Sequence, residues 1–158
     1  MQRPGQPVTA SATATATYGH VVVGVTGSRT SAAALEWAAR LAADRSWPLD
    51  VVTAWPDPAE EFVHTVPGHH CHPLEEAVAS METTLAKARD VTDQVPVLTT
   101  YVENAHATDA LLTHCDDASV LVLGAAHGHS HPGIPSAHVA DACACLAPCP
   151  VVVVDVSS

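Results

Sequence analysis

The sequence predicts a single doubly wound α/β domain, built as three layers on a five-stranded parallel sheet with four helices. Two observations support this prediction. Short β-branched segments alternate with segments of helical periodicity, which is the pattern of parallel strands joined by helical crossovers. The segments 21–23, 120–123 and 151–154 are continuously apolar, as expected of strands that are covered on both faces.

The first half of the domain contains two strand–helix units. The β-branched segment 20–25 predicts a strand, and the alanine-rich segment 30–46 predicts a helix. The sequence LDVVTAW at 49–55 predicts the second strand. After a long loop over 56–73, apolar residues recur at steps of four and three over 74–90, which predicts an amphipathic helix.

The second half repeats the alternation. The segment 95–102 alternates in polarity and contains Pro96, which suits an edge strand because proline cannot donate to a sheet ladder. The remaining predicted elements are a helix at 107–118, a strand at 119–124, a helix at 137–147 and a strand at 150–156. Ligands of such folds bind beyond the carboxyl ends of the strands.

Composition limits the classes of function. The 158 residues suffice for one domain, which we expect over 19–158 after a flexible tail at 1–18. The net charge of −11, with only six lysines and arginines, argues against a nucleic-acid partner. Because we find neither a membrane-spanning apolar run nor a signal-peptide core, we expect a cytoplasmic protein without membrane contact.

Three stretches resemble the universal stress protein family. They are VVVGVTGSRTSAAALEWAARLA from Val21, TDALLTHCDDASVLVLGAAHG from Thr108 and LAPCPVVVVD from Leu146. The resemblance implies the strand order 3-2-1-4-5, which places the loops after strands 1 and 4 side by side. It also implies a binding or regulatory module of the stress response, and a homodimer paired through the last strand at 151–154. We expect no enzyme activity beyond at most weak nucleotide hydrolysis.

The resemblance also implies where ATP would bind. Many family members carry Gly-x2-Gly-x9-Gly-Ser/Thr after strand 4, because glycines and a helix N-terminus let backbone N–H groups approach phosphates. The pattern falls here on Gly124, His127, Ala137 and His138, so only the first position matches. Gly128 lies one residue late and can substitute in part.

The loop after strand 1 departs from the family as well. It usually reads Asp-Gly-Ser, and here Thr26 replaces the acid before Gly27 and Ser28. We therefore predict a degenerate nucleotide site. A functional ATP or adenine-nucleotide site is the first alternative.

Two histidine-rich segments, 64–72 and 127–131, define a second alternative. Both follow predicted strands, so the parallel topology brings them to one edge of the sheet. Imidazole nitrogen and thiolate are ligands of Zn, Cu and Ni. The candidate ligands for a transition metal, or for acid sensing in the case of the second segment, are His69, His70, Cys71, His72, His127, His129 and His131. Solvated loops without any ligand would show the same composition.

The five cysteines lack a Cys-x-x-Cys pair, and without an export signal we expect free thiols. Cys143 lies on the apolar stripe of its helix and, like Cys115, is predicted to be core. Cys145 faces away from Cys143, which leaves a redox sensor at Cys145 as a further hypothesis. No Gly-x-Ser-x-Gly elbow occurs, so we predict no catalytic residue.

Overall fold

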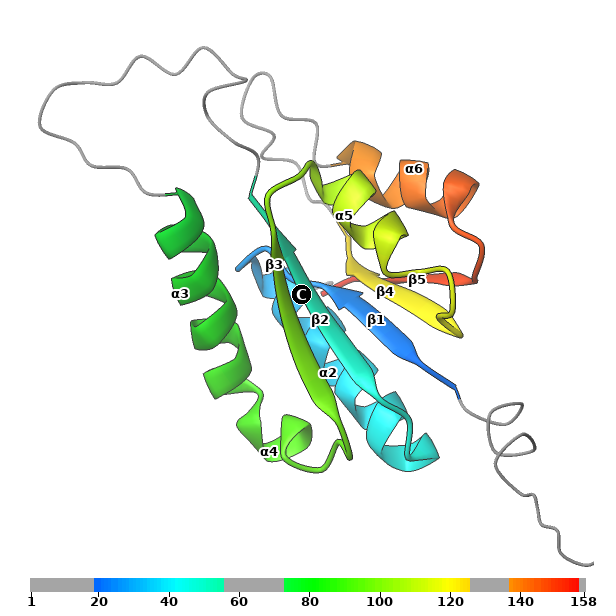
Figure 1. Ribbon diagram of the computed structural model, residues 1–158. Coiled ribbons are helices and arrows are strands. Elements are labelled where there is room, and N and C mark those ends of the chain that lie inside the picture. The colour runs from blue at the N-terminus through cyan, green and yellow to red at the C-terminus, as the bar shows by residue number, and fades with distance from the viewer. Residues whose placement is uncertain (1–18, 56–72, 126–136, 157–158) are drawn as a thin grey trace, which may run out of the picture.

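A five-stranded parallel sheet organises the chain (Figure 1). The computed structural model describes residues 19–55, 73–125 and 137–156. The strands are β1 (Val21–Gly24), β2 (Leu49–Ala54), β3 (Leu98–Glu103), β4 (Val120–Gly124) and β5 (Val151–Val154). Their order is β3-β2-β1-β4-β5, which confirms the predicted fold class and strand order.

Helices cover both faces of this sheet (Figure 1). They are α2 (Arg29–Arg45), α3 (Pro73–Lys87), α4 (Arg89–Thr92), α5 (Ala107–Thr113) and α6 (Ala137–Leu146). The first three lie on one face and the last two on the other, as right-handed crossovers require when the chain moves outward from β1 in both directions. None of the described helices has the length and hydrophobicity needed to cross a membrane.

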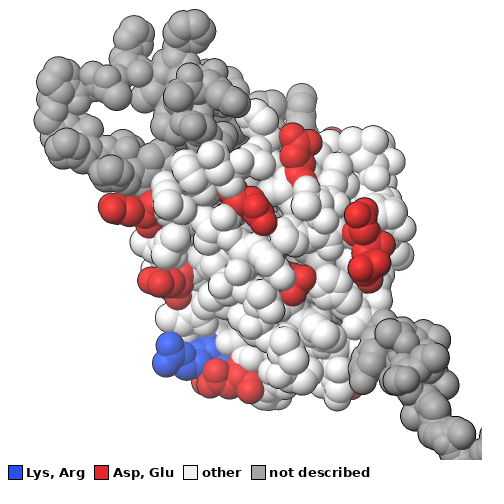
Figure 2. Space-filling model, viewed as in Figure 1, with Lys and Arg blue, Asp and Glu red and all other residues white. Residues whose placement is uncertain are grey.

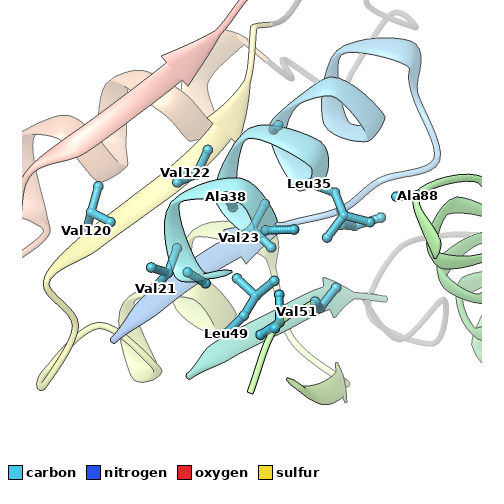
Figure 3. Close-up of a cluster of buried hydrophobic side chains, with 14 of the residues drawn as sticks. Val21, Val23, Leu35, Ala38, Leu49, Val51, Ala88, Val120 and Val122 are labelled. Atoms are coloured by element: carbon cyan, nitrogen blue, oxygen red, sulfur yellow. The ribbon is translucent and has the colours of Figure 1, made fainter. Parts of the chain in front are cut away.

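The core lies in two layers, one on each side of the sheet. Figure 3 shows the larger, in which Val21, Val23 and Val122 of the sheet pack against Leu35 and Ala38 of α2. The smaller layer joins Val22 and Leu121 to Leu111, Cys115 and Cys143 on the opposite side. Alternate residues of β1 thus enter different layers, which explains why its sequence is continuously apolar.

The predicted helix over 74–90 is wrong in one detail. It breaks at Ala88, whose φ of −100° and ψ of 13° separate α3 from the short helix α4. Ala88 is buried, and the change of direction lets α4 pack against α2. The described residues therefore form five helices, one more than expected.

Two other boundaries also differ from the prediction. The helix expected over 107–118 ends at Thr113, because its last turn tightens through bonds of the 3₁₀ type from Cys115 N–H to the Leu112 carbonyl, 3.1 Å. Strand β3 begins at Leu98, after Pro96. It is an edge strand, as that proline predicted.

Candidate functional site

The carboxyl ends of β1 and β4 lie side by side at one edge of the sheet. The register pairs Val23 of β1 with Val122 of β4, so the two strands end side by side. Helix α2, which follows β1, lies on one face of the sheet, and α6, the next described helix after β4, lies on the other. This is the topological switch point at which α/β sheets bind ligands.

The loop after β1 is held by its own hydroxyl groups. The Thr26 hydroxyl donates to Ser28 Oγ over 3.0 Å, and the Thr26 N–H donates to Ser31 Oγ over 3.2 Å. Ser28 caps α2 by accepting the Ser31 N–H, 3.2 Å away. Gly27 has a φ of +88°, and a side chain there would collide with the hydroxyl of Ser80 on α3. The first turn of α2 is thus already capped from within the chain.

Gly124 has a packing role that sequence reasoning missed. A Cβ at this position would lie 2.5 Å from the carbonyl carbon of Thr30 and 2.6 Å from the Ser31 nitrogen. Real Cβ atoms essentially never approach other atoms so closely. The end of β4 therefore needs a glycine so that it can lie against the first turn of α2, whether or not a ligand binds.

An open groove of about 510 Å³ begins beside this loop and runs between α2 and α3. Small and hydroxyl-bearing residues line much of it, among them Gly27, Ser28 and Ser80. Arg29 and Lys87 add positive charge to the lining, and Glu36 adds one acid. The groove is chemically suited to a small anionic molecule.

Charge on the face shown in Figure 2 follows the acidic composition. Acidic side chains are spread over that face, whereas basic side chains gather at its lower left. The overall formal charge of −11 has the same sign.

Many sequence-predicted site residues lie outside the described residues. They are His69, His70, Cys71, His72, His127, Gly128, His129 and His131. Ala137 and His138 open helix α6. Within the described ranges, no group of three His, Cys, Asp or Glu residues could hold a metal ion. The metal and acid-sensing hypotheses for the histidine-rich segments stay predictions from sequence.

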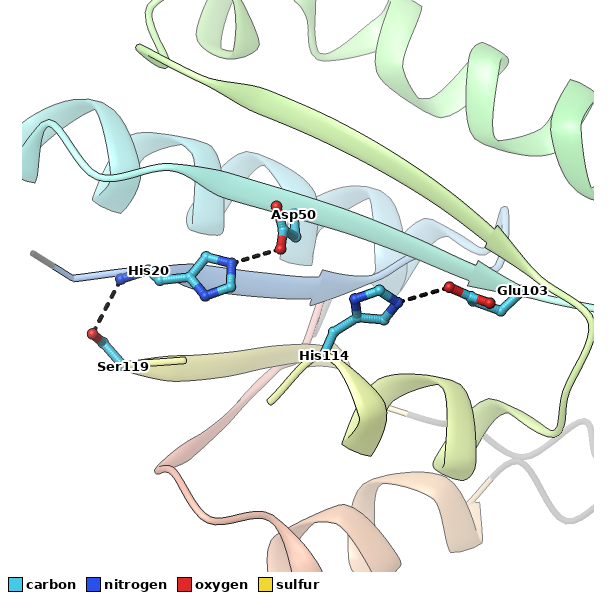
Figure 4. A network of polar contacts seen from close by, with 5 residues as sticks. All are labelled: His20, Asp50, Glu103, His114 and Ser119. Carbon is cyan, nitrogen blue, oxygen red and sulfur yellow. Dashed lines mark hydrogen bonds and ion pairs between the residues drawn. The ribbon is translucent and has the colours of Figure 1, made fainter. Parts of the chain in front are cut away.

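Two histidine–carboxylate pairs emerge on the sheet instead (Figure 4). His20 Nε2 lies 2.6 Å from Asp50 Oδ2, and His114 Nε2 lies 2.9 Å from Glu103 Oε1. Ser119 accepts the backbone N–H of His20, so its hydroxyl bonds to the main chain and not to the ring. These contacts are therefore structural. The register that pairs Val22 with Asp50 brings His20 and Asp50 together, and no sequence signal gives that register.

Removing the Asp50 carboxylate is expected to cost about 1–2 kcal/mol of unfolding free energy, because it leaves the mostly buried imidazole without its partner. The side chains of His20 and Asp50 are only 23% and 14% exposed. Urea unfolding of Asp50→Ala measures the effect. Glu36→Ala is the control and should cost clearly less, since its ion pair with Arg40, 4.0 Å long, lies on the surface with the two side chains 47% and 67% exposed. Equal losses from Asp50→Ala and Glu36→Ala would contradict this account.

Comparison with known proteins agrees with the fold. Residues 17–155 match the universal stress protein family. A universal stress protein solved in complex with cAMP is similar at 24% identity, over 89% of this chain and 98% of that chain, with a TM-score of 0.61. No curated protein matched the sequence significantly.

Two further solved structures have the same fold. The universal stress protein of Archaeoglobus fulgidus in complex with dAMP has 22% identity and a TM-score of 0.58, over 87% of this chain and 98% of that chain. A family protein of Arabidopsis thaliana with AMP bound has 15% identity and a TM-score of 0.57, over 89% and 93%. From the extent of the family match, this chain belongs to the universal stress protein family.

Proposed function

We propose that this chain acts in a stress response as a binding or regulatory module. We also propose that the carboxyl edge of its sheet does not bind ATP through a glycine-rich loop. The observation that carries the proposal is the close fit of Gly124 against α2. The one glycine that matches the family's ATP pattern is required by packing, so its presence does not argue for a phosphate site. Thr26 replaces the family's acid, and its hydroxyl bonds to Ser28.

Thermal denaturation of tag-free, metal-stripped protein tests this proposal. A ligand present at about 100 times its Kd adds about 2.7 kcal/mol, which raises the Tm of a domain this size by about 5–10 °C. We expect ATP with Mg²⁺ to leave the Tm unchanged. A rise of that size with ATP would overturn the proposal.

An adenine monophosphate is a second candidate ligand. Three similar solved structures are described as complexes with cAMP, dAMP and AMP, none of which needs a grip on a triphosphate. The groove beside Gly27 carries Arg29 and Lys87, which supports binding of an anion of this size. AMP and cAMP belong in the same titration. A rise in Tm with a monophosphate but not with ATP supports this candidate. An unchanged Tm with both kinds of nucleotide excludes it.

We also propose a homodimer that pairs through β5. This strand lies at one edge of the sheet, and its backbone groups along the outer side would otherwise be free to pair with another chain. Val153 is 46% exposed, which is unusual for a valine within an apolar strand. Burial of this edge against a second copy accounts for both features.

A further inference from the structure

Three cysteines from two separate parts of the chain gather beside one core layer. Cys115 follows α5, Cys143 lies in α6, and Cys149 lies in the segment between α6 and β5. Cys115 and Cys143 are completely buried, whereas Cys149 is partly exposed and packs against the same layer. Helices α5 and α6 are in contact, which brings the segments that carry these thiols together.

Cys149 packs against the core layer that contains Cys115, and a side-chain hydrogen bond with Cys149 is among the causes that raise the pKa of Cys115. Burial, followed by the proximity of Cys149, raises the pKa of the Cys115 thiol to about 12. Burial also raises the pKa of Cys143. The two buried thiols therefore keep their protons at neutral pH, and Cys149 is the member of the cluster that solvent reaches.

Other readings of the cluster are less consistent with its geometry. A metal site is disfavoured, because the described residues bring no three potential ligands into coordinating positions. Cys145 is exposed on α6, but no contact between it and another thiol is seen in the described ranges. Cys149 is partly exposed to solvent and packs against the layer that contains a second thiol, Cys115, and these are two of the features of a redox-sensor cysteine.

We propose that Cys149 and Cys115 are a peroxide-sensitive dithiol, which closes to an intramolecular disulfide linking the end of α5 to the segment before β5. Hydrogen peroxide is the oxidant. This inference is independent of nucleotide binding and of the dimer. It assigns the redox role to Cys149 in place of Cys145.

The chemistry needs one peroxide per pair. The Cys149 thiolate attacks one peroxide oxygen and breaks the O–O bond, which gives a sulfenic acid at Cys149 and releases the other oxygen as water. The Cys115 sulfur then attacks the Cys149 sulfur, and the departing hydroxide leaves as water with the Cys115 proton. Two thiols are oxidised to a disulfide while one peroxide is reduced to two waters.

The disulfide should stabilise the native state. Because Cys149 packs against the layer that contains Cys115, we expect closure to require little rearrangement of α5 or of the segment before β5. The new loop encloses β4 and α6, so the cross-link restricts the unfolded chain far more than the native one. We expect the Tm of the oxidised protein to rise by about 5 °C or more, and dithiothreitol should reverse the rise.

The test uses the full chain, reduced and then treated with hydrogen peroxide, with the intact mass and the cross-linked peptides identified without reduction. Trypsin cannot locate the bond, because Arg89 is the last lysine or arginine of the sequence and all four cysteines after it remain on one peptide. Cleavage before aspartates releases Cys115 in 109–115, separate from 141–154. Chymotryptic cleavage after Leu146 then separates Cys149 from the other two cysteines.

The expected product is a monomer lighter by two hydrogen atoms, with the Cys115 peptide joined to the Cys149 peptide. Cys149→Ser should abolish this product, whereas the matched change Cys145→Ser on the exposed face of α6 should retain it. A disulfide between any other two cysteines overturns the assignment, as does over-oxidation of Cys149 without a cross-link. The peptide map of the unmodified sequence decides the question even if a variant folds poorly.

Discussion

Replacing Gly124 by alanine is expected to lower the free energy of unfolding by about 3 kcal/mol, near the upper end of the usual cost of overpacking. The added methyl group would meet the backbone of Thr30 and Ser31 at 2.5–2.7 Å. Backbone atoms in the first turn of α2 cannot rotate away as a side chain can, so β4 and α2 must separate. Urea denaturation measures the loss of free energy, and thermal denaturation should show a fall in Tm of about 6–12 °C.

Gly24→Ala is the matched control for this change. A Cβ at Gly24 would approach a methyl group of Leu123 at 2.9 Å and one of Leu111 at 3.1 Å. These are the ends of flexible side chains, so we expect a clearly smaller loss of stability than at Gly124. Equal losses would show that the fit between β4 and α2 is not what requires Gly124. If only Gly124→Ala causes a large loss of stability, this variant is damaged in its packing. Loss of nucleotide binding by Gly124→Ala would then not be evidence that Gly124 contacts a phosphate.

Replacing Val153 by lysine should dissociate the proposed dimer, raising its Kd by about 100-fold, which corresponds to about 2.7 kcal/mol. Lysine on an edge strand opposes pairing with another strand, because its ammonium group loses water and gains no partner. In a twofold-symmetric interface, each substitution occurs twice. Sedimentation equilibrium across a range of protein concentrations measures the change.

Val97→Lys provides the matched control at the opposite side of the sheet. Val97 is 55% exposed and precedes the other edge strand, β3. The same chemical change there should leave the association unchanged. A monomeric parent protein, or equal dissociation by both variants, would remove β5 as the interface.

Much of the fold could be predicted because local pattern and burial agree. The apolar runs at 21–23 and 120–123 are central strands with their side chains in the two core layers. Helical periodicity over 30–46 matches α2, whose buried residues include Leu35 and Ala38. Each of these features depends on which faces of a single helix or strand are buried. The spacing of apolar residues along the chain shows this directly.

The site was predicted less completely, because its contacts join distant segments. Sequence reasoning placed Gly124 beside the loop of Gly27, and the register of β1 and β4 agrees. It assigned that glycine to phosphate approach, whereas the closest neighbours of the position are the backbone atoms of Thr30 and Ser31. No local sequence pattern predicts that the end of β4 will pack against the first turn of α2.

The sequence by itself determined the strand–helix alternation and the burial of Cys115 and Cys143, because composition and periodicity encode the apolar side of each element. The family followed from the resemblance of three stretches to universal stress proteins, and the family match confirms it. Only the tertiary structure decided that Ala88 divides a helix, that His20 meets Asp50 and that Cys149 packs against the layer that contains Cys115. Such pairings depend on strand register and on helix packing across the sheet. These are set by the sum of many long-range contacts and not by any short stretch of residues.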